Sequence, residues 1–439
     1  MTVHDMHGLT LTGASATSLA AYEQALAELQ CYRADPVASI DRAIADDPGF
    51  AMGHAMRAWL HLLGTEPAGY AIAEASHREA MTHAATRREK GHAAAIAALL
   101  GGGWHEAGRI LEDIALEHPH DGLALIAGHQ IDFFRGDARM LRDRIARAMP
   151  HWDAGRPGYH SVLGMYAFGL EETGHFPQAE RIGRQGVEIE PRDGWSQHAV
   201  AHVLEMQNRS VEGIAWMTQS EAWAQDSFFA VHNWWHLALY HLELGQFDAV
   251  FDLLDQRILG SGLVTVIDLI DASAMLWRLA LRGVDAAERW QGVADRWQQS
   301  GQPGLYAFND VHMIMALIGA GRTQAAKEVL AALAEAAHGG GDNARFSAEI
   351  GLPVGQALWD FGRGDYASCA RRLRAIRGMS RRFGGSDAQR DVLDLTLIEA
   401  ALRAGDGALA RGLAAERDAM RHESPLTQLF LRRAQALAS

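Results

Sequence analysis

The chain has 439 residues, of which 48% are hydrophobic, and its mean hydropathy is −0.12. A chain of this size and composition can bury a large core, so its stability needs no disulfide bonds or structural metals. The formal net charge of −14 repels phosphate backbones and anionic lipid head groups. We therefore expect neither nucleic acid nor a membrane surface as the main partner.

The two cysteines, Cys31 and Cys369, are far apart and form no metal or redox motif. Such sparse use of cysteine is typical of a reducing compartment. The N-terminal residues show no basic start followed by an apolar run, and no stretch of about 18 apolar residues occurs. The sequence therefore predicts a cytoplasmic protein without a signal peptide or a membrane span.

Helix-forming residues dominate the chain, and alternating runs of β-branched residues are almost absent. Apolar residues recur at spacings of three and four, as at Ile110, Leu111 and Ile114, which predicts amphipathic helices. Frequent Gly and Pro residues predict that each helix has an ordinary length. The sequence therefore predicts an all-α protein.

A recurring pattern of a Gly turn, an aromatic residue and a small residue predicts the starts of helices along the chain. It is clearest at residues 174–179, where a helix begins that should end at Glu190 and pack on a partner at about 161–173. Degraded copies lie near residues 43–48, 102–119, 245–247 and 364–369. The spacing matches the tetratricopeptide period of about 34 residues. We therefore predict an α-solenoid of irregular tetratricopeptide-like helix-turn-helix repeats, forming a superhelix and a single domain over residues 1–439.

Two histidine pairs stand out against this repeat pattern. His198 and His202 are four residues apart on a predicted helix, and Glu205 follows three residues later, so the three side chains share one helix face. One repeat later, His232 and His236 form a second pair with the same spacing. Equivalent helices of a solenoid line the same concave surface, so we expect the two pairs to converge.

Other polar and aromatic residues extend this candidate site over residues 195–312. They follow at intervals of about one repeat: Trp235, Asp271, Arg278, Asn309, Asp310 and His312. A second polar segment, residues 385–391, follows a Gly-rich turn and contains Gln389, Arg390 and Asp391. Its Ser386 or Asp387 is predicted to cap the next helix.

The residue types leave three interpretations open. Imidazoles and carboxylates that meet could bind a divalent metal ion, with His198, His202, His232 and His236 as candidate ligands. They could instead perform acid–base catalysis, for which the candidates are the same four histidines with Glu205 and His312. Ala199 occupies the position of the glutamate in the zinc-protease motif, so that motif is absent. Alternatively, these side chains serve only as hydrogen-bonded links between stacked helices.

The chain resembles the tetratricopeptide repeat protein 38 family almost from end to end. The segments that carry this resemblance are residues 47–56, 86–89, 198–206, 232–236, 266–279, 308–312, 351–353, 385–391 and 424–427. The resemblance implies a helical-repeat fold and implies no particular reaction. Its polar residues coincide with the candidate site.

The hypothesis that we favour from the sequence is a protein that binds a small molecule or a peptide segment in a concave pocket. Catalytic and metal-ligand candidates are those named above, and ligand contacts are expected from Trp235, Asp271, Arg278, Asn309, Asp310, Gln389, Arg390 and Asp391. The alternatives are a metal-assisted or histidine-dependent hydrolase, with a divalent metal as cofactor, and an oligomeric interaction scaffold. The sequence leaves open whether the protein is an enzyme and whether it forms a homo-oligomer.

Overall fold

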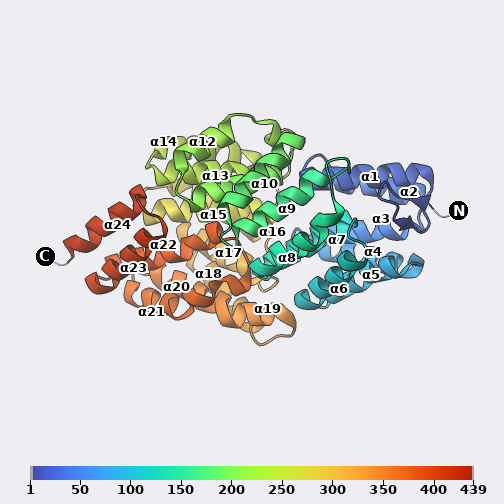
Figure 1. The fold of residues 1–439 in the computed structure, drawn as a ribbon. Coiled ribbons are helices and arrows are strands. Elements are labelled where there is room, and N and C mark those ends of the chain that lie inside the picture. The colour runs from blue at the N-terminus through green and yellow to red at the C-terminus, as the bar shows by residue number, and fades with distance from the viewer. Residues whose placement is uncertain (1–2, 438–439) are drawn as a thin grey trace. The chain divides into compact units, whose positions relative to one another are not determined.

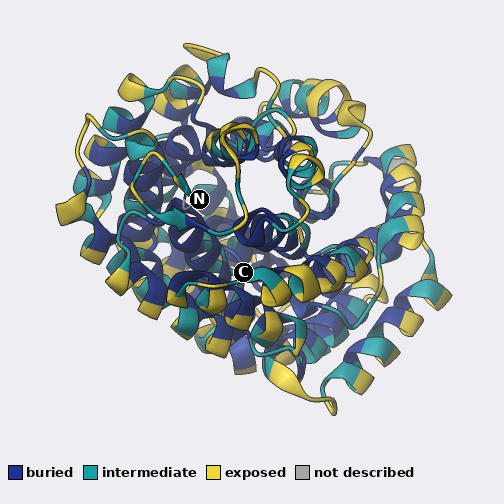
Figure 2. Ribbon diagram, turned by 90° about the vertical axis from the view of Figure 1, so that its right-hand side faces the viewer, coloured by how far each residue is buried: buried dark blue, intermediate teal, exposed yellow. Residues whose placement is uncertain are grey.

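The computed structural model describes residues 3–437, and it is an all-α helical-repeat solenoid (Figure 1). A short antiparallel sheet of β1 (Val3–His4) and β2 (Thr10–Leu11) precedes the first helix. Figure 2 shows that the helices carry a buried stripe along one face and an exposed stripe along the other. This is the amphipathic pattern that the spacing of apolar residues predicts. The predicted fold class is confirmed.

The described residues divide into two compact units. The first contains residues 3–200 and 220–230. Its helices are α1 (Ala16–Cys31), α2 (Pro36–Asp46), α3 (Ala51–Leu62), α4 (Pro67–His83), α5 (Arg87–Leu100), α6 (Trp104–Glu117), α7 (Gly122–Phe134), α8 (Ala138–Ala148), η1 (Met149–His151), α9 (Tyr159–Glu171), α10 (Phe176–Ile189) and η2 (Ala222–Ala224). Helix α11 (Gly194–Met206) begins in this unit, and its last residues belong to the second.

The second unit contains residues 201–219 and 231–437. Its elements are α12 (Ser210–Thr218), α13 (Ala230–Glu243), α14 (Phe247–Leu253), η3 (Leu254–Ile258), η4 (Leu259–Ser261), α15 (Val266–Leu281), α16 (Ala287–Ser300), α17 (Ala307–Gly319), α18 (Thr323–Ala336), α19 (Gly341–Phe346), η5 (Ser347–Gly351), α20 (Leu352–Gly362), α21 (Tyr366–Ile376), η6 (Arg377–Phe383), α22 (Asp387–Arg403), α23 (Gly407–Met420) and α24 (Pro425–Ala436). Within it, α15 packs on both α17 and α22.

The hairpin of α9 and α10 shows how the sequence determines where paired helices begin and how closely they pack. Gly174 adopts a φ of +80° in the turn, and α10 then begins at Phe176, as the repeat pattern predicts. A Cβ atom on Gly186 would lie 2.3 Å from the Ser196 Oγ atom, so glycine allows the start of α11 to approach α10 closely. Helices also begin at the predicted aromatic residues Trp104, Phe247 and Tyr366.

No helix within residues 3–437 has both the length and the apolar character that crossing a membrane requires. The single domain proposed over residues 1–439 stays a prediction, and residues 1, 2, 438 and 439 lie outside the described part. Each of the two units is built from consecutive helices that pack on one another.

Candidate functional site

Three histidines of the second unit meet in its interior. His202 comes from the end of α11, and His232 and His236 lie one turn apart on α13. The ring centroids of His202 and His236 are 4.5 Å apart, and those of His232 and His236 are 5.0 Å apart. All three side chains are buried. The predicted convergence of these residues is therefore present in the structure.

A buried carboxylate accepts a hydrogen bond from the Nδ1–H group of two of these histidines. The Asp271 carboxylate lies 2.8 and 3.0 Å from the Nδ1 atom of His232, and a Glu205 oxygen lies 3.0 Å from that of His236. Such bonds fix the tautomer in which the Nε2 atom carries the lone pair. Metal-ligating histidines in proteins almost always have a partner of this kind on the other ring nitrogen.

The start of α15 positions the Asp271 carboxylate. Thr265 and Asp268 form a reciprocal capping box there, in which each side chain accepts a hydrogen bond from the main chain of the other residue. Asp271 lies three residues further along the helix and has no exposed surface. The cap therefore fixes the helix start that directs Asp271 towards α13.

Burial shifts the pKa of His236 and of the two carboxylates. It lowers the pKa of His236 well below the usual value, and neighbouring His202 and His232 add to the shift. Burial also raises the pKa of Asp271 and of Glu205, which nearby basic residues offset only in part. A neutral imidazole is the form that binds metals, and a bound cation would favour the ionised carboxylates.

Each of the three histidines offers a ring nitrogen, and these ligand atoms lie within 4.8 Å of one another. Nitrogen ligands at the usual zinc distance are about 3.3 Å apart in a tetrahedral site, so small side-chain movements would suffice to ligate an ion. The three imidazoles, with carboxylates behind two of them, could therefore hold a divalent transition metal.

His198 lies one turn before His202 on α11, in the part of the helix that belongs to the first unit. Its ring centroid lies 4.9 Å from that of Trp195, 5.2 Å from that of Phe229 and 5.4 Å from that of Phe168. The i, i+4 spacing predicted from the sequence is present, and the first unit surrounds this ring with aromatic side chains.

Trp235 and Arg278 lie beside the three histidines. The Trp235 ring stacks on His232 with an interplanar angle of 15°, and the Arg278 guanidinium lies 5.3 Å from the centre of the same ring. Arg278 donates hydrogen bonds to the main-chain oxygens of Ala388 and Gln389, at 2.8 and 3.5 Å. Burial lowers the pKa of Arg278 to about 10. The two predicted contact residues thus form a buried cation–π pair.

The segment at residues 385–391 divides between local and longer-range roles. Ser386 caps α22, as predicted, and the Gln389 side chain completes that capping box. Arg390 pairs with Asp387 and with main-chain oxygens of the preceding turn. Asp391 accepts two hydrogen bonds from Arg417, at 2.6 and 3.1 Å. Gln389 therefore serves the helix start, while Asp391 belongs to a largely buried ion pair.

Asp391, at the start of α22, interacts electrostatically with arginines that lie near the histidine group. Burial alone would raise its pKa, but the charges of Arg417 and Arg421 outweigh this and hold the pKa well below its usual range. Arg421 also lies 3.9 Å from Glu205, which bonds to His236. A buried charge network therefore surrounds the histidine group.

The residues predicted on α17 are buried but have partners close in sequence. The His312 Nδ1 atom donates to the Phe308 main-chain oxygen at 2.8 Å, and burial lowers its pKa to about 4. Asp310 accepts hydrogen bonds from the Gly304 amide, and burial raises its pKa to about 7. Asn309 is also buried. Among the described residues, the histidine group that could ligate a metal does not include His312.

A second arrangement, which no sequence pattern predicts, lies in the first unit. Cys31 ends α1 and His160 lies at the start of α9, with the Sγ and Nε2 atoms 3.9 Å apart. The Nδ1 atom of His160 lies 2.9 Å from an Asp193 oxygen. The separation of Cys31 and His160 by 129 positions hides this contact from any spacing argument.

No family model matches the chain. Solved structures similar to it include the human IFIT1 dimer with m7Gppp-AAAA, which is 15% identical, with a TM-score of 0.40 over 95% of this chain and 100% of that one. The yeast Tom70 crystal structure is 11% identical, with a TM-score of 0.32 over 96% of this chain and 87% of that one. The helix pairs themselves define the chain as a tetratricopeptide-like helical-repeat protein.

Proposed function

We propose that this protein belongs to the tetratricopeptide repeat protein 38 family and that its second unit binds a divalent transition-metal ion. The ligands are His202, His232 and His236. The observation that supports the proposal most strongly is the pair of buried carboxylates, Asp271 and Glu205, which bond to the Nδ1 atoms of two of these histidines. Histidines that only link helices do not require this arrangement around a common centre.

The chemistry of the ligands favours a transition metal such as zinc over calcium or magnesium. Imidazole suits zinc, copper, iron and nickel, whereas calcium and magnesium prefer oxygen ligands. Zinc is commonly held by three protein ligands with a fourth position for water or a substrate. The proposal thus includes the metal-assisted hydrolase as an enzymatic form of the same site, in which the ion would supply Lewis-acid chemistry.

A second candidate function is the binding of a small anionic molecule next to the same histidines. Arg278 supports it, because its guanidinium is buried over Trp235 and its hydrogen-bonded acceptors are main-chain oxygens rather than a carboxylate. A ligand carboxylate would pair well with such a group. A cytoplasmic location, and partners other than nucleic acid, remain part of the proposal.

Metal analysis tests the proposal directly. The wild-type protein, purified without chelator and dialysed, should contain one metal ion per chain by native mass spectrometry. Replacing His236 with Gln should abolish stoichiometric binding and leave the helical circular dichroism unchanged. The matched control is His312→Gln, which removes another buried histidine of the same unit and should keep the metal. A metal content that is absent from the wild type, or equal in both variants, contradicts the proposal.

Acidification sharpens this test. Ligation requires neutral imidazoles, so protons compete with the ion as the pH falls below the usual histidine range. The depressed pKa of His236 means that its own protonation begins only in more acidic solution. We expect metal to be retained at pH 7 and released during titration towards pH 4, as measured with a colorimetric zinc chelator.

A further inference from the structure

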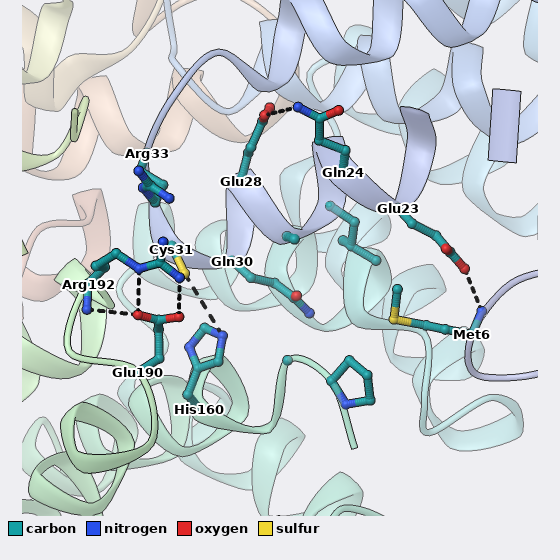
Figure 3. Close-up of a pocket in the computed structure, with 14 residues that line it drawn as sticks. Met6, Glu23, Gln24, Glu28, Gln30, Cys31, Arg33, His160, Glu190 and Arg192 are labelled. Atoms are coloured by element: carbon teal, nitrogen blue, oxygen red, sulfur yellow. Dashed lines mark hydrogen bonds and ion pairs between the residues drawn. The ribbon is translucent and has the colours of Figure 1, made fainter. Parts of the chain in front are cut away.

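A cavity of about 340 Å³ lies in the first unit, outside the histidine group of the second. Figure 3 shows that the end of α1 forms one of its sides and that His160 and Glu190 approach from another. Cys31 lines this cavity although only 6% of its surface is exposed. A volume of this size is at the lower end of the range for small-molecule sites.

Two side chains of the cavity wall, Cys31 and His160, are arranged in series with Asp193, which is buried behind His160. The Cys31 sulfur lies 3.9 Å from the His160 Nε2 atom, and the opposite ring nitrogen lies 2.9 Å from Asp193. A nucleophile, a base within reach of it and a third group that orients the base are the components of a cysteine–histidine–acid triad. Hydrogen bonds of such triads are often long without a substrate.

The carboxylate of this series is held firmly. Asp193 accepts hydrogen bonds from the main-chain amides of Trp195 and Ser196 at 3.0 Å, and from the Ser196 hydroxyl at 2.7 Å. The two amides bind Oδ1 and fix the start of α11, whereas the Ser196 hydroxyl and His160 share Oδ2. A capping role explains Asp193 by itself, but it does not explain why His160 also faces a sulfur atom on a cavity wall.

The groups around the His160 ring favour its imidazolium form. Burial lowers the pKa of His160, but the hydrogen bond that its Nδ1–H group donates to Asp193 and the contact with Cys31 outweigh this and raise the pKa to about 10. Arg192 adds a second positive charge near the sulfur and is itself paired with Glu190 (Figure 3). A cysteine next to a protonated histidine or an arginine is typical of reactive thiols.

Two further polar groups line the cavity with unused hydrogen-bonding capacity. The Nε atom of Arg33 is buried without an acceptor, and the nearest acid to its guanidinium, Asp226, is 4.0 Å away. Gln30 makes no side-chain hydrogen bond to any residue that the structure describes. A guanidinium can anchor a carboxylate, and an amide can donate to an oxyanion.

We propose that Cys31, His160 and Asp193 form a catalytic site for acyl transfer from small amides or esters that carry a carboxylate. The Cys31 proton passes to the His160 Nε2 atom, and the sulfur attacks the acyl carbon. The bond from that carbon to the leaving nitrogen or oxygen then breaks, and His160 returns the proton to the leaving group. Water, deprotonated by His160, attacks the thioester; the carboxylic acid leaves, and the proton returns to the sulfur.

In this site Asp193 is a positioning residue, because it acts through His160. Arg33 selects the substrate by pairing with its carboxylate, and Gln30 donates to the oxyanion of the tetrahedral intermediate. This inference is independent of the proposed metal site, since every residue that it uses lies in the first unit. Failure of one proposal therefore leaves the other standing.

Two matched esters test the chemistry in the full-length protein. The 4-nitrophenyl monoester of succinic acid carries the required carboxylate, whereas 4-nitrophenyl butyrate has a similar length without it. We expect a burst of nitrophenolate and an acyl adduct on Cys31, both larger with the succinate ester. Cys31→Ala should remove both signals. Arg33→Gln should remove the preference between the esters while retaining the adduct.

Cys369 provides an internal control for reactivity. It is fully buried in the second unit, and burial raises its pKa to about 12. Peptide mapping after brief treatment with iodoacetamide at pH 6.5 should find Cys31 alkylated and Cys369 intact. In a folded His160→Gln variant, the ratio of Cys31 alkylation rates at pH 6.5 and pH 9 should fall by about tenfold or more.

Three results would overturn the proposal. They are equal labelling of the two cysteines, an unchanged pH profile in His160→Gln, and no acyl adduct on Cys31 with either ester. If His160→Gln does not fold, Asp193→Asn serves as the second variant. It should keep Cys31 reactive and reduce the burst rate by weakening the orientation of His160.

Discussion

Each of the two units contains a histidine whose Nδ1 atom is hydrogen-bonded to a buried carboxylate. The pKa of this histidine is raised in one unit and lowered in the other. In the first unit His160 faces Asp193 on one side and the Cys31 sulfur on the other, and its pKa is raised to about 10. In the second unit His236 faces Glu205 and two other imidazoles, and its pKa is well below normal. In the roles that we propose, the second neighbour of the ring therefore distinguishes a histidine that carries a proton from one that binds a metal.

The largest expected effect concerns the ion pair of Asp391 and Arg417 in the second unit. Asp391→Ala should lower the free energy of unfolding by about 3–5 kcal/mol, because it leaves Arg417 buried without its partner. Urea denaturation measures this loss. Asp255→Ala is the control in the same unit, since its pair with Arg289 is exposed and should contribute about 1 kcal/mol or less. Equal losses would contradict a special role for the buried pair.

The next effect is the pH dependence of the unfolding free energy, which should reflect the raised pKa of His160. The pKa of His160 is about 10 in the folded state and 6.5 by reference, so its stabilisation is complete below pH 6.5 and is lost as the pH rises towards 10. We expect the unfolding free energy to fall by about 2–4 kcal/mol over this range. The loss should be smaller in His160→Gln, as measured by urea denaturation at each pH. A parallel pH dependence in both proteins would refute the assignment.

A smaller effect should show that the cysteine site and the proposed metal site respond independently to a substitution. Gly186→Ala places a Cβ atom against the Ser196 Oγ atom, which holds Asp193. Overpacking of this kind costs about 1–3 kcal/mol and should displace the carboxylate behind His160. We expect a slower burst with the succinate ester and an unchanged metal content. Loss of both properties together would show that the substitution disrupts the fold more widely.

The smallest effect tests whether the start of α22 serves structure alone. Ser386→Ala removes the cap that bonds to the Gln389 amide and should cost about 1 kcal/mol. Thermal denaturation should show a slightly lower midpoint, with the metal content and the Cys31 reactivity retained. A loss of metal in this variant would instead place residues 385–391 in the binding site.

Much of the fold could be predicted because it depends on local patterns. The turn glycine at 174 and the aromatic residue at 176 predict where α10 begins, and the histidine spacings predict which side chains share a face. The convergence of His202 with His236 follows from the repeat, since equivalent positions lie about 34 residues apart. The place after a Gly-rich turn predicts a helix cap at Ser386 or Asp387, and the structure has the cap at Ser386.

The remaining features depend on contacts that no periodic pattern encodes. The cavity beside Cys31 requires the end of α1 to meet the start of α9, which lies 129 positions away from it. His312 resembles the other histidines in sequence, yet its ring bonds to the main chain of its own helix. The partner of each side chain, rather than its type, separates His312 from His236.

The most direct test of the account is X-ray absorption spectroscopy at the zinc edge of the zinc-loaded wild-type protein. The proposed ligands predict a first shell of nitrogen at about 2.0–2.1 Å, with imidazole scattering and no sulfur. That signal should disappear in His236→Gln and persist in His312→Gln. A first shell of oxygen alone, or one that contains sulfur at about 2.3 Å, would contradict the three-histidine site.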